Sequence, residues 1–385
     1  MDRKQPTDVR RIFMRILCLT LVFAALIALG VQDASAAVAQ NIAQVQAESA
    51  DGAAQSVAPT LSGKSFSLSF EDEILVNFYY TVSDITDVAQ HGVLVFYANP
   101  ATGSYDAADE VYNETMYDSV KNRYNITTTG IAAKEMGDTR YYVAYAKLND
   151  GTYIYSGAYD YSPKKYAMNM LGRESTSDKQ KALCVAMLNF GAAAQVYFGY
   201  NTDALMNAEL TEEQKALVMD YDAELFKGTV PADASKQGDF GATAGFSGKA
   251  ATVSFDGAFA INYYFTPDAA VAGDMTLYIW DAGDYAAVSQ LTAANASDVV
   301  TMEQQPNGSY WGQAAGIAAK ALDETYYVAG VYTDANGNRC CTGVVAYSLS
   351  KYCMNNAAPG KDMQSLAANT AMYGYYAKVF FETKS

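Results

Sequence analysis

Histidine is almost absent from this sequence of 385 residues, in which His91 is the only one. Ser-His-Asp and Cys-His catalysis both need a positioned imidazole as base, and helical zinc motifs need two histidines. The chain also has no glycine-rich phosphate loop and no Cys-x-x-Cys pair. These shortages exclude most catalytic classes and indicate neither a metal nor a cofactor. The turn-like setting of His91, between Gln90 and Gly92, favours a surface position.

Basic residues are scarce as well, with 26 Lys and Arg against 42 Asp and Glu. Removal of a predicted signal peptide, residues 1–36, would leave 21 basic and 39 acidic residues and a net charge near −18. Nucleic acids and anionic membrane surfaces repel such a protein at long range. We therefore expect neither as a partner.

The signal peptide is predicted from its three parts. Three arginines within residues 10–15 precede an apolar run over residues 16–29, and Ala-Ser-Ala at 34–36 then supplies small residues for cleavage. The run is shorter than the roughly 20 residues of a membrane-spanning helix. The sequence therefore predicts a protein that is secreted, either extracellular or associated with the cell surface, with no membrane span after cleavage.

Four cysteines follow residue 36, and an exported protein allows a disulfide among them. The adjacent Cys340 and Cys341 would point to opposite faces of a strand, so at most one of them is expected to face the core. Whether either pairs with Cys353 stays open. Cys184 has no counterpart in the internal repeat.

That repeat is the main organising feature of the chain. A Gly-Ile-Ala-Ala-Lys segment followed by Tyr-Tyr-Val-Ala occurs twice, and the copies are offset by 186 residues at Gly130, at Gly151 and at Tyr161. The chain therefore contains two copies of one fold. The repeated segments are residues 130–134 with 141–144, and 316–320 with 326–329.

Short segments rich in Tyr, Val and Thr, separated by Gly and Asn turns, predict an antiparallel β-sandwich or barrel. Residues 74–80 and 259–265 are largely apolar on both faces, apart from Asn77 and Asn262 in mid-strand. This strand is therefore expected to be central, with helices covering its second face. The predicted fold class is mainly β with helices (α+β): two tandem β-sandwich modules, each followed by a C-terminal helical pair.

Helix signals follow each set of strands. Ser162 before Pro163 starts a short helix, and Ser177 with Gln180 forms a capping box for a longer one over residues 178–198. A second capping box, Thr211 with Gln214, predicts a helix through Leu225 and Phe226. Apolar stripes are expected at Leu183, Met187, Phe190, Gly191 and Ala194, and at Leu366, Tyr373, Gly374, Ala377 and Phe381. The predicted organisation is signal peptide 1–36, flexible leader 37–60, first module 61–201, helical linker 202–244 and second module 245–385.

Aromatic residues are abundant, with 31 Tyr, 16 Phe and 2 Trp. Most tyrosines are expected in the core, Tyr142, Tyr145 and Tyr161 with hydroxyls tied to backbone. Exposed Tyr and Trp provide flat platforms for sugars or protein partners at little entropic cost. The predicted binding residues are Trp280, Tyr310 and Trp311, which lie in loop or strand-edge contexts of the second module.

Two other kinds of site are considered. Glycoside cleavage needs two carboxylates about 5 to 10 Å apart, for which the candidates are Glu71, Asp72, Glu73, Asp109, Glu110 and Glu114; no acid pair is carried by both copies. Residues 334–338 resemble the start of a calcium loop, but Val345 and Ala346 stand where its final acid belongs. Asn-Gly here favours a hairpin turn.

The chain resembles a known kind of module. Lys134 to Thr139, followed by Tyr-Tyr-Val-Ala-Tyr-Ala and Asn-Asp-Gly, is similar to the later strands of fibronectin type III or immunoglobulin-like sandwiches. Together with Tyr161-Ser162 and residues 181–200, it resembles a module of large secreted and surface proteins from anaerobic gut Clostridia. The resemblance covers nearly all of both modules. It implies a surface location, often beside adhesion segments, and no established activity.

The sequence thus leads to a secreted, non-catalytic binding or adhesion protein, which contacts a glycan or an extracellular protein through exposed aromatics. Duplication suits binding, because two weak sites on one chain gain avidity. A monomer is the working expectation, with the oligomeric state left open. Two alternatives also stay open: a carboxylate-dependent carbohydrate-active enzyme, and a purely structural spacer.

Overall fold

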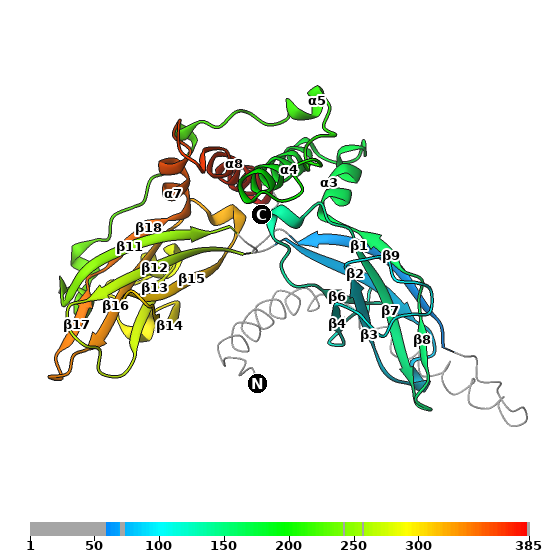
Figure 1. Cartoon of the computed structure of the whole chain (residues 1–385), viewed down its shortest axis with the longest axis horizontal. Coiled ribbons are helices and arrows are strands. Elements are labelled where there is room, and N and C mark those ends of the chain that lie inside the picture. The colour runs from blue at the N-terminus through cyan, green and yellow to red at the C-terminus, as the bar shows by residue number, and fades with distance from the viewer. Residues whose placement is uncertain (1–58, 70–73, 242, 256–257, 383–385) are drawn as a thin grey trace, which may run out of the picture. The chain divides into compact units, whose positions relative to one another are not determined.

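The computed structural model describes residues 59–69, 74–241, 243–255 and 258–382 (Figure 1). The predicted signal peptide, and the predicted leader as far as residue 58, lie outside the described residues. The described chain is mainly β, with several antiparallel sheets and accompanying helices. This is the coarse fold class that the sequence predicts.

Two antiparallel sheets form the first module. One has the strand order β1-β2-β6-β5, and the other has the order β4-β3-β7-β8 with β9 also paired to β7. The strand β2 is central, as predicted, and the Phe78 ring on it lies 5.7 Å from the Tyr142 ring of the opposite sheet. The strands are β1 Leu61–Ser69, β2 Leu75–Val82, β3 Val88–Phe96, β4 Glu110–Tyr112, β5 Met116–Asp118, β6 Arg123–Thr127, β7 Arg140–Leu148, β8 Tyr153–Tyr155 and β9 Tyr159–Tyr161.

The second module repeats this order, with one strand shared between its sheets. β14 pairs with β13 through its first residues and with β15 through its last, so the sheets join into one of nine strands. In the first module β4 and β5 take these two roles separately. The strands are β10 Thr243–Ala244, β11 Phe246–Ser254, β12 Phe259–Pro267, β13 Met275–Trp280, β14 Asp298–Gln304, β15 Tyr310–Ile317, β16 Thr325–Thr333, β17 Arg339–Thr342 and β18 Val345–Ser348.

The repeated Tyr-Tyr-Val-Ala segments are not in equivalent register. Ala144 N donates to Ser156 Oγ, and 186 residues further on Gly330 N donates to Thr342 Oγ1. The structural offset here is therefore 186, whereas the two Tyr-Tyr-Val-Ala segments are 185 apart.

This single residue changes where the tyrosines lie, because a slip of one residue turns a side chain to the other face of the sheet. Tyr142 corresponds to Val328, and both are in the core between the sheets. Tyr327 instead stacks on Tyr285 on the outer side of its sheet, with ring centroids 3.5 Å apart. The Tyr142 ring is buried as predicted, but its hydroxyl has no hydrogen-bond partner within the described chain.

The predicted helical pairs are present in both modules. Ser162 Oγ accepts a hydrogen bond from Lys165 N, and Ser177 Oγ accepts one from Gln180 N, so both predicted N-cap residues are confirmed. Of the predicted Ser177–Gln180 capping box only this half is present within the described chain, and Gln180 Nε2 donates to the Tyr166 hydroxyl at 3.1 Å. Gly199, in the left-handed conformation at φ 64°, ends the longer helix. The pairs are α3 Pro163–Leu171 with α4 Asp178–Phe198, and α7 Leu349–Asn356 with α8 Gln364–Glu382. Within the described residues α4 is the one helix long and apolar enough to cross a membrane, and most of it is buried in protein.

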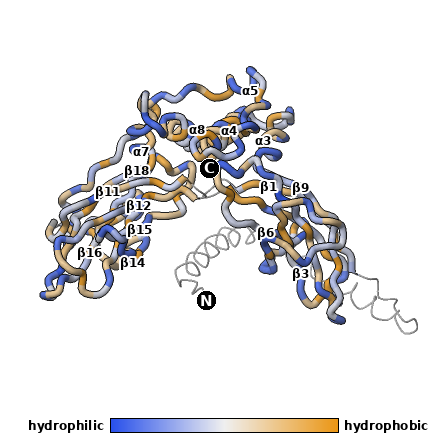
Figure 2. The backbone as a smooth tube through the Cα atoms, in the orientation of Figure 1, coloured by the Kyte–Doolittle hydropathy of each residue, from blue (hydrophilic) through white to orange (hydrophobic). Residues whose placement is uncertain are grey.

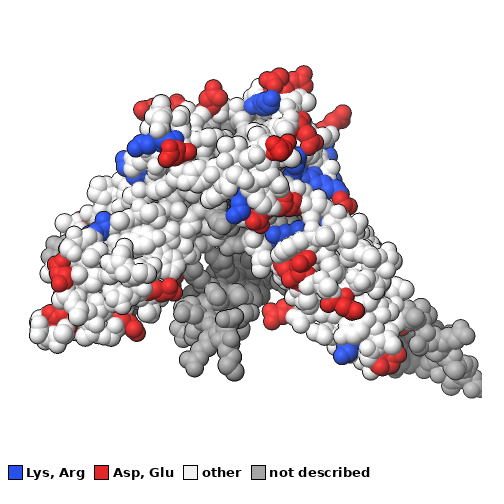
Figure 3. Space-filling view, in the orientation of Figure 1, with Lys and Arg blue, Asp and Glu red and all other residues white. Residues whose placement is uncertain are grey.

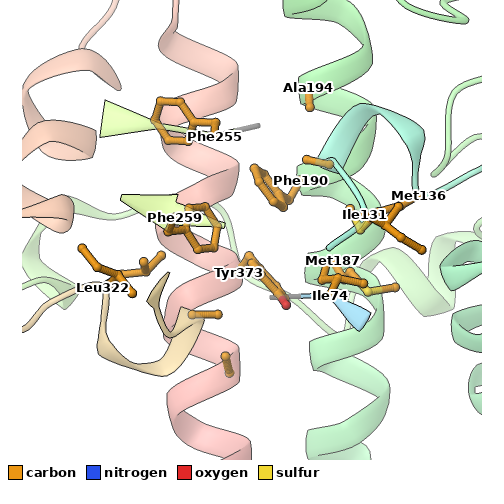
Figure 4. Close-up of a cluster of buried hydrophobic side chains, with 14 of the residues drawn as sticks. Ile74, Ile131, Met136, Met187, Phe190, Ala194, Phe255, Phe259, Leu322 and Tyr373 are labelled. Carbon is orange, nitrogen blue, oxygen red and sulfur yellow. The ribbon is translucent and has the colours of Figure 1, made fainter. Parts of the chain in front are cut away.

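The long helices cover an end of the sheets. α4 packs on α8 and on the 3₁₀ turn η2 (Ala133–Glu135), and α8 packs on the equivalent turn η7 (Ala319–Ala321). Figure 4 shows Phe190 of α4 facing Tyr373 of α8, and their rings stack 5.5 Å apart. Hydrophobic residues accordingly run through both helices in Figure 2. The prediction that helices cover the second face of β2 is wrong, because their apolar stripes meet these turns and each other.

The predicted linker has less helix than expected. The Thr211–Gln214 capping box is present, but the helix it starts, α5, covers only Glu212–Lys215, and a 3₁₀ turn, η3, follows at Ala223–Leu225. Residues further on lie against the second module, where Phe240 is buried with Trp280.

Candidate binding face

Alternate residues of the central strands β2 and β12 point away from the core. On β2 these include Asn77 and Tyr79, and on β12 Asn262 and Tyr264, 185 residues further on. Both tyrosines are partly exposed, and both asparagines are largely covered by neighbours on the same surface. We call this surface the outer face of each module. It comprises Ser69, Asn77, Tyr79, Asn125 and Thr127 in the first module and Ser254, Asn262, Tyr264, Trp311 and Gln313 in the second.

Hydrogen bonds fix the amide group on the second outer face. Asn262 Nδ2 donates to Ser254 Oγ at 3.0 Å. Asn262 Oδ1 accepts from Gln313 Nε2 at 3.0 Å and from Trp311 Nε1 at 3.1 Å. Three strands are thereby linked through one side chain, and the Trp311 indole is held by its N–H.

The first outer face keeps this arrangement without the indole. Asn77 Nδ2 donates to Ser69 Oγ at 2.9 Å, and Asn77 Oδ1 accepts from Thr127 Oγ1 at 2.7 Å. Asn125 stands opposite Tyr79 in the strand register, where Trp311 stands opposite Tyr264. The asparagine–serine pair is therefore common to both copies.

The tyrosines differ in what covers them. The Arg123 guanidinium lies 3.7 Å from the centroid of the Tyr79 ring and also pairs with Asp118. Tyr264 has Trp311 as its cross-strand neighbour, at a spacing that allows adjacent side chains to contact each other. The second outer face therefore presents two partly exposed aromatic rings beside amide and hydroxyl groups, whereas the first has an arginine over its ring.

Of the three predicted binding residues, Trp280 is not exposed. Its side chain has 0% relative exposure, and its Nε1 donates to Asn295 Oδ1 at 2.9 Å. Phe240 of the intermodule segment and Tyr285 of helix α6 (Ala282–Ala287) pack with it in a separate cluster outside the sheet. The expectation of an exposed Trp280 is wrong, because the intermodule segment around Phe240 and the helix α6 that directly follows this strand both cover it.

Tyr310 and Trp311 are separated by the alternation of β15. Tyr310 pairs with Phe265 of β12 and packs, partly buried, against the inner core. Trp311, the next residue, points to the outer face. The structure therefore does not bring the three predicted residues together, and only Trp311 stays at a surface with another aromatic.

Sequence reasoning missed Tyr264 and the role of Asn262 on this face. The signal was a polar residue kept at mid-strand in both copies of an otherwise apolar strand. The interpretation that both faces of this strand are covered led away from Asn262 and Tyr264 as surface residues.

Among the candidate acids, Glu110 lies in a dense polar cluster. Arg140 Nη1 lies 3.3 Å from Glu110 Oε1, with both side chains largely buried. The hydroxyls of Tyr97 and Tyr112 donate to the same carboxylate, and the hydrogen bond to Glu110 raises the pKa of Tyr97 to about 12.

Glu71, Asp72 and Glu73 lie outside the described residues. In the described chain, no group of three or more His, Cys, Asp or Glu side chains could hold a metal ion.

His91 is in a strand and not in a turn. It pairs with Ala146 on β7, and its Nδ1 lies 2.7 Å from the Tyr80 hydroxyl. Burial lowers the pKa of His91. The expectation of a surface turn is wrong, since Gly92 continues the strand with its Cα close to the neighbouring backbone.

The cysteines and residues 334–338, for which the sequence favours a hairpin turn over a calcium loop, have structural explanations. Cys184, Cys340, Cys341 and Cys353 are free and buried. Cys340 and Cys341 do lie on opposite faces of β17, but both are covered, because the intermodule segment buries the outer side. Residues 334–338 form the β16–β17 hairpin turn, in which Asp334 Oδ1 accepts from the backbone of Asn336 and Asn338.

No protein-family model matches the chain, and no curated protein matches it.

Proposed function

We propose that this is a secreted, non-catalytic binding protein of tandem immunoglobulin- or fibronectin type III-like modules, which binds glycan through the outer face of the second module. The observation that carries the proposal is the pair Trp311 and Tyr264 beside the hydrogen-bonded Asn262. Aromatic rings offer flat, amphipathic contact surfaces at low entropic cost. Amide and hydroxyl groups next to them can donate to and accept from sugar hydroxyls.

The strand order supports the immunoglobulin-like assignment. The orders β1-β2-β6-β5 and β4-β3-β7-β8 correspond to the ABED and C′CFG sheets of that fold when strands are named along the chain. Such sandwiches commonly belong to cell-surface and extracellular proteins. The apolar run over residues 16–29 supports export, and the resemblance to secreted modules of gut Clostridia supports the same location.

The test is an array of glycans and extracellular proteins probed with residues 37–385 and with Trp311→Ala. Tyr153→Ala, which removes an aromatic residue that is 49% exposed on the other sheet of the first module, is the matched control. We expect saturable glycan binding that Trp311→Ala abolishes and Tyr153→Ala leaves intact. Binding to a protein spot alone would replace the ligand class, and no binding anywhere would favour a spacer.

A further inference from the structure

The second outer face continues onto the strands on either side of Tyr264 and Trp311. Directly opposed residues of antiparallel strands point to the same side of a sheet. Trp311 is paired with Glu303 of β14, and Tyr264 is paired with Ala250 of β11, which is exposed and too small to cover the tyrosine ring. At about 4.8 Å between strands, this row of four residues is about 14 Å long. The row is therefore long enough to contact more than one sugar of a glycan chain.

Glu303 is the charged member of this row. The preceding residue, Met302, is buried in the core, so the alternation of β14 turns Glu303 outward. Its side chain is exposed, and within the described chain its carboxylate has neither a hydrogen-bond donor nor an ion-pair partner. The adjacent row, Thr252, Asn262 and Gln313, is uncharged. Glu303 therefore brings a free carboxylate to the edge of the Trp311 indole.

The first module has a different residue at each of these places. Met116 of β5, which is 60% exposed, is paired with Asn125, and Asn125 is paired with Tyr79. The charge beside this row is positive, because Arg123 lies over the Tyr79 ring and its Nη1 donates to Ser65 Oγ at 3.2 Å. An acid beside an indole is thus a feature of the second module alone.

The wider charge distribution acts in the same direction as Glu303. Figure 3 shows lysines and arginines gathered mainly near the helices, and acidic groups with large uncharged areas over the strands of the second module. The whole chain has 42 acidic against 26 basic residues. Such a field repels anionic ligands, so a glycan that carries uronate or sulfate groups is disfavoured at this face.

We propose that Glu303 restricts the second outer face to neutral glycans with adjacent free hydroxyls, one ring of which stacks on Trp311. This inference rests on the glycan binding proposed above. An ionised carboxylate only accepts hydrogen bonds, and its two oxygens can accept from two neighbouring sugar hydroxyls. Hydrogen bonds to a charged acceptor are roughly twice as strong as neutral ones. Uronate and sulfate groups bring further acceptors and negative charge, so Glu303 repels them.

The test prints each neutral polysaccharide of the glycan array beside an acidic counterpart, such as xylan beside glucuronoxylan and desulfated beside sulfated galactan. Residues 37–385 are titrated as the wild type, Glu303→Gln, Glu303→Lys and Trp311→Ala. We expect the wild type to prefer the neutral member of a pair and Glu303→Gln to bind it at least about tenfold more weakly. Glu303→Lys should prefer the acidic member, and Trp311→Ala should bind neither.

Glu213→Gln and Glu213→Lys are the matched controls, because they make the same charge changes at an exposed residue of α5. Both should bind as the wild type does, with every variant folded by circular dichroism. Binding that Trp311→Ala abolishes but Glu303→Gln leaves unchanged would overturn this inference and leave the proposed glycan binding standing. A wild-type preference for the acidic members would overturn it in the same way. No glycan binding by the wild type would overturn both proposals.

Discussion

The two modules keep one framework and differ at their surfaces. Both hold an outward asparagine on a serine, through Asn77 and Ser69 in the first and Asn262 and Ser254 in the second. Beside this shared pair, the first module has an arginine over its tyrosine ring, and the second has Trp311 next to its tyrosine. The comparison teaches that the hydrogen bonds linking the strands were kept while the exposed contact surface changed, so the modules should not bind alike.

The variants with the largest expected effect, Gly374→Leu and Gly191→Leu, test how each long helix packs on its module. In Gly374→Leu, the first side-chain carbon would lie 2.7 Å from Leu322 and 3.0 Å from the Ala319 carbonyl oxygen. In Gly191→Leu it would meet the flexible end of Met206. Overpacking costs about 1 to 3 kcal/mol or more, and we expect the larger loss at Gly374, where the obstacle includes backbone. Urea unfolding of both variants measures the difference.

Val196→Leu, at an exposed position of α4, controls for the new side chain. A Gly374→Leu protein as stable as this control would show that the helix is not in close contact with η7.

The next variant makes the second outer face resemble the first. Trp311→Asn introduces the residue that the first module has at this position, Asn125, and leaves Gln313 to hold Asn262. We expect glycan binding to be lost, with unfolding free energy changed by no more than about 1 kcal/mol. Array binding and thermal melting, measured on the same preparation, check both parts. Retained binding would move the site away from this face.

Some of the features behind these two predictions could be predicted from the sequence, and others could not. The mid-strand asparagines, the helix caps and the β-rich fold class can all be predicted from local patterns of a few residues. The burial of Trp280 cannot, since part of its cover comes from Phe240, which lies 40 residues earlier in the sequence and meets it only in the fold. Likewise the identity of two Tyr-Tyr-Val-Ala segments suggested equivalence, but hydrogen bonds across the sheet set the register one residue away.

A smaller effect is expected on the pH dependence of stability, because the core of the first module contains His91 and the core of the second does not. His91 accepts a hydrogen bond from Tyr80 only when Nδ1 is unprotonated, and burial places its folded-state pKa below the ordinary 6.5. The unfolded chain then binds the proton more readily, so stability should fall as pH drops through about 6.5 toward the folded-state pKa. Met275 takes the corresponding inward position in the second module.

His91→Met should therefore flatten this part of the stability profile, as measured by urea unfolding between pH 7 and pH 5, conditions that span the histidine transition. The wild-type profile above pH 7 provides the baseline. Identical slopes for the two proteins in the acid range would show that His91 titrates as it does in the unfolded chain.

The smallest expected effect comes from Arg123→Ala, which uncovers the Tyr79 ring. The variant loses a cation–π contact of about 0.5 to 1 kcal/mol and a partly exposed ion pair with Asp118 that contributes little. We expect a slight drop in melting temperature and new, weak glycan binding in a Trp311→Asn background. Absence of that gain would show that one aromatic ring is insufficient, and Asn125→Trp would then be the variant to add.

The stacking of Phe190 on Tyr373 has a consequence for association. These residues occupy the same position on α4 and α8, and a residue that meets its own counterpart is characteristic of a two-fold dimer interface. Here both halves belong to one polypeptide, so the intermodule segment sets their effective concentration. Dilution, which separates ordinary dimers, cannot separate these two helices.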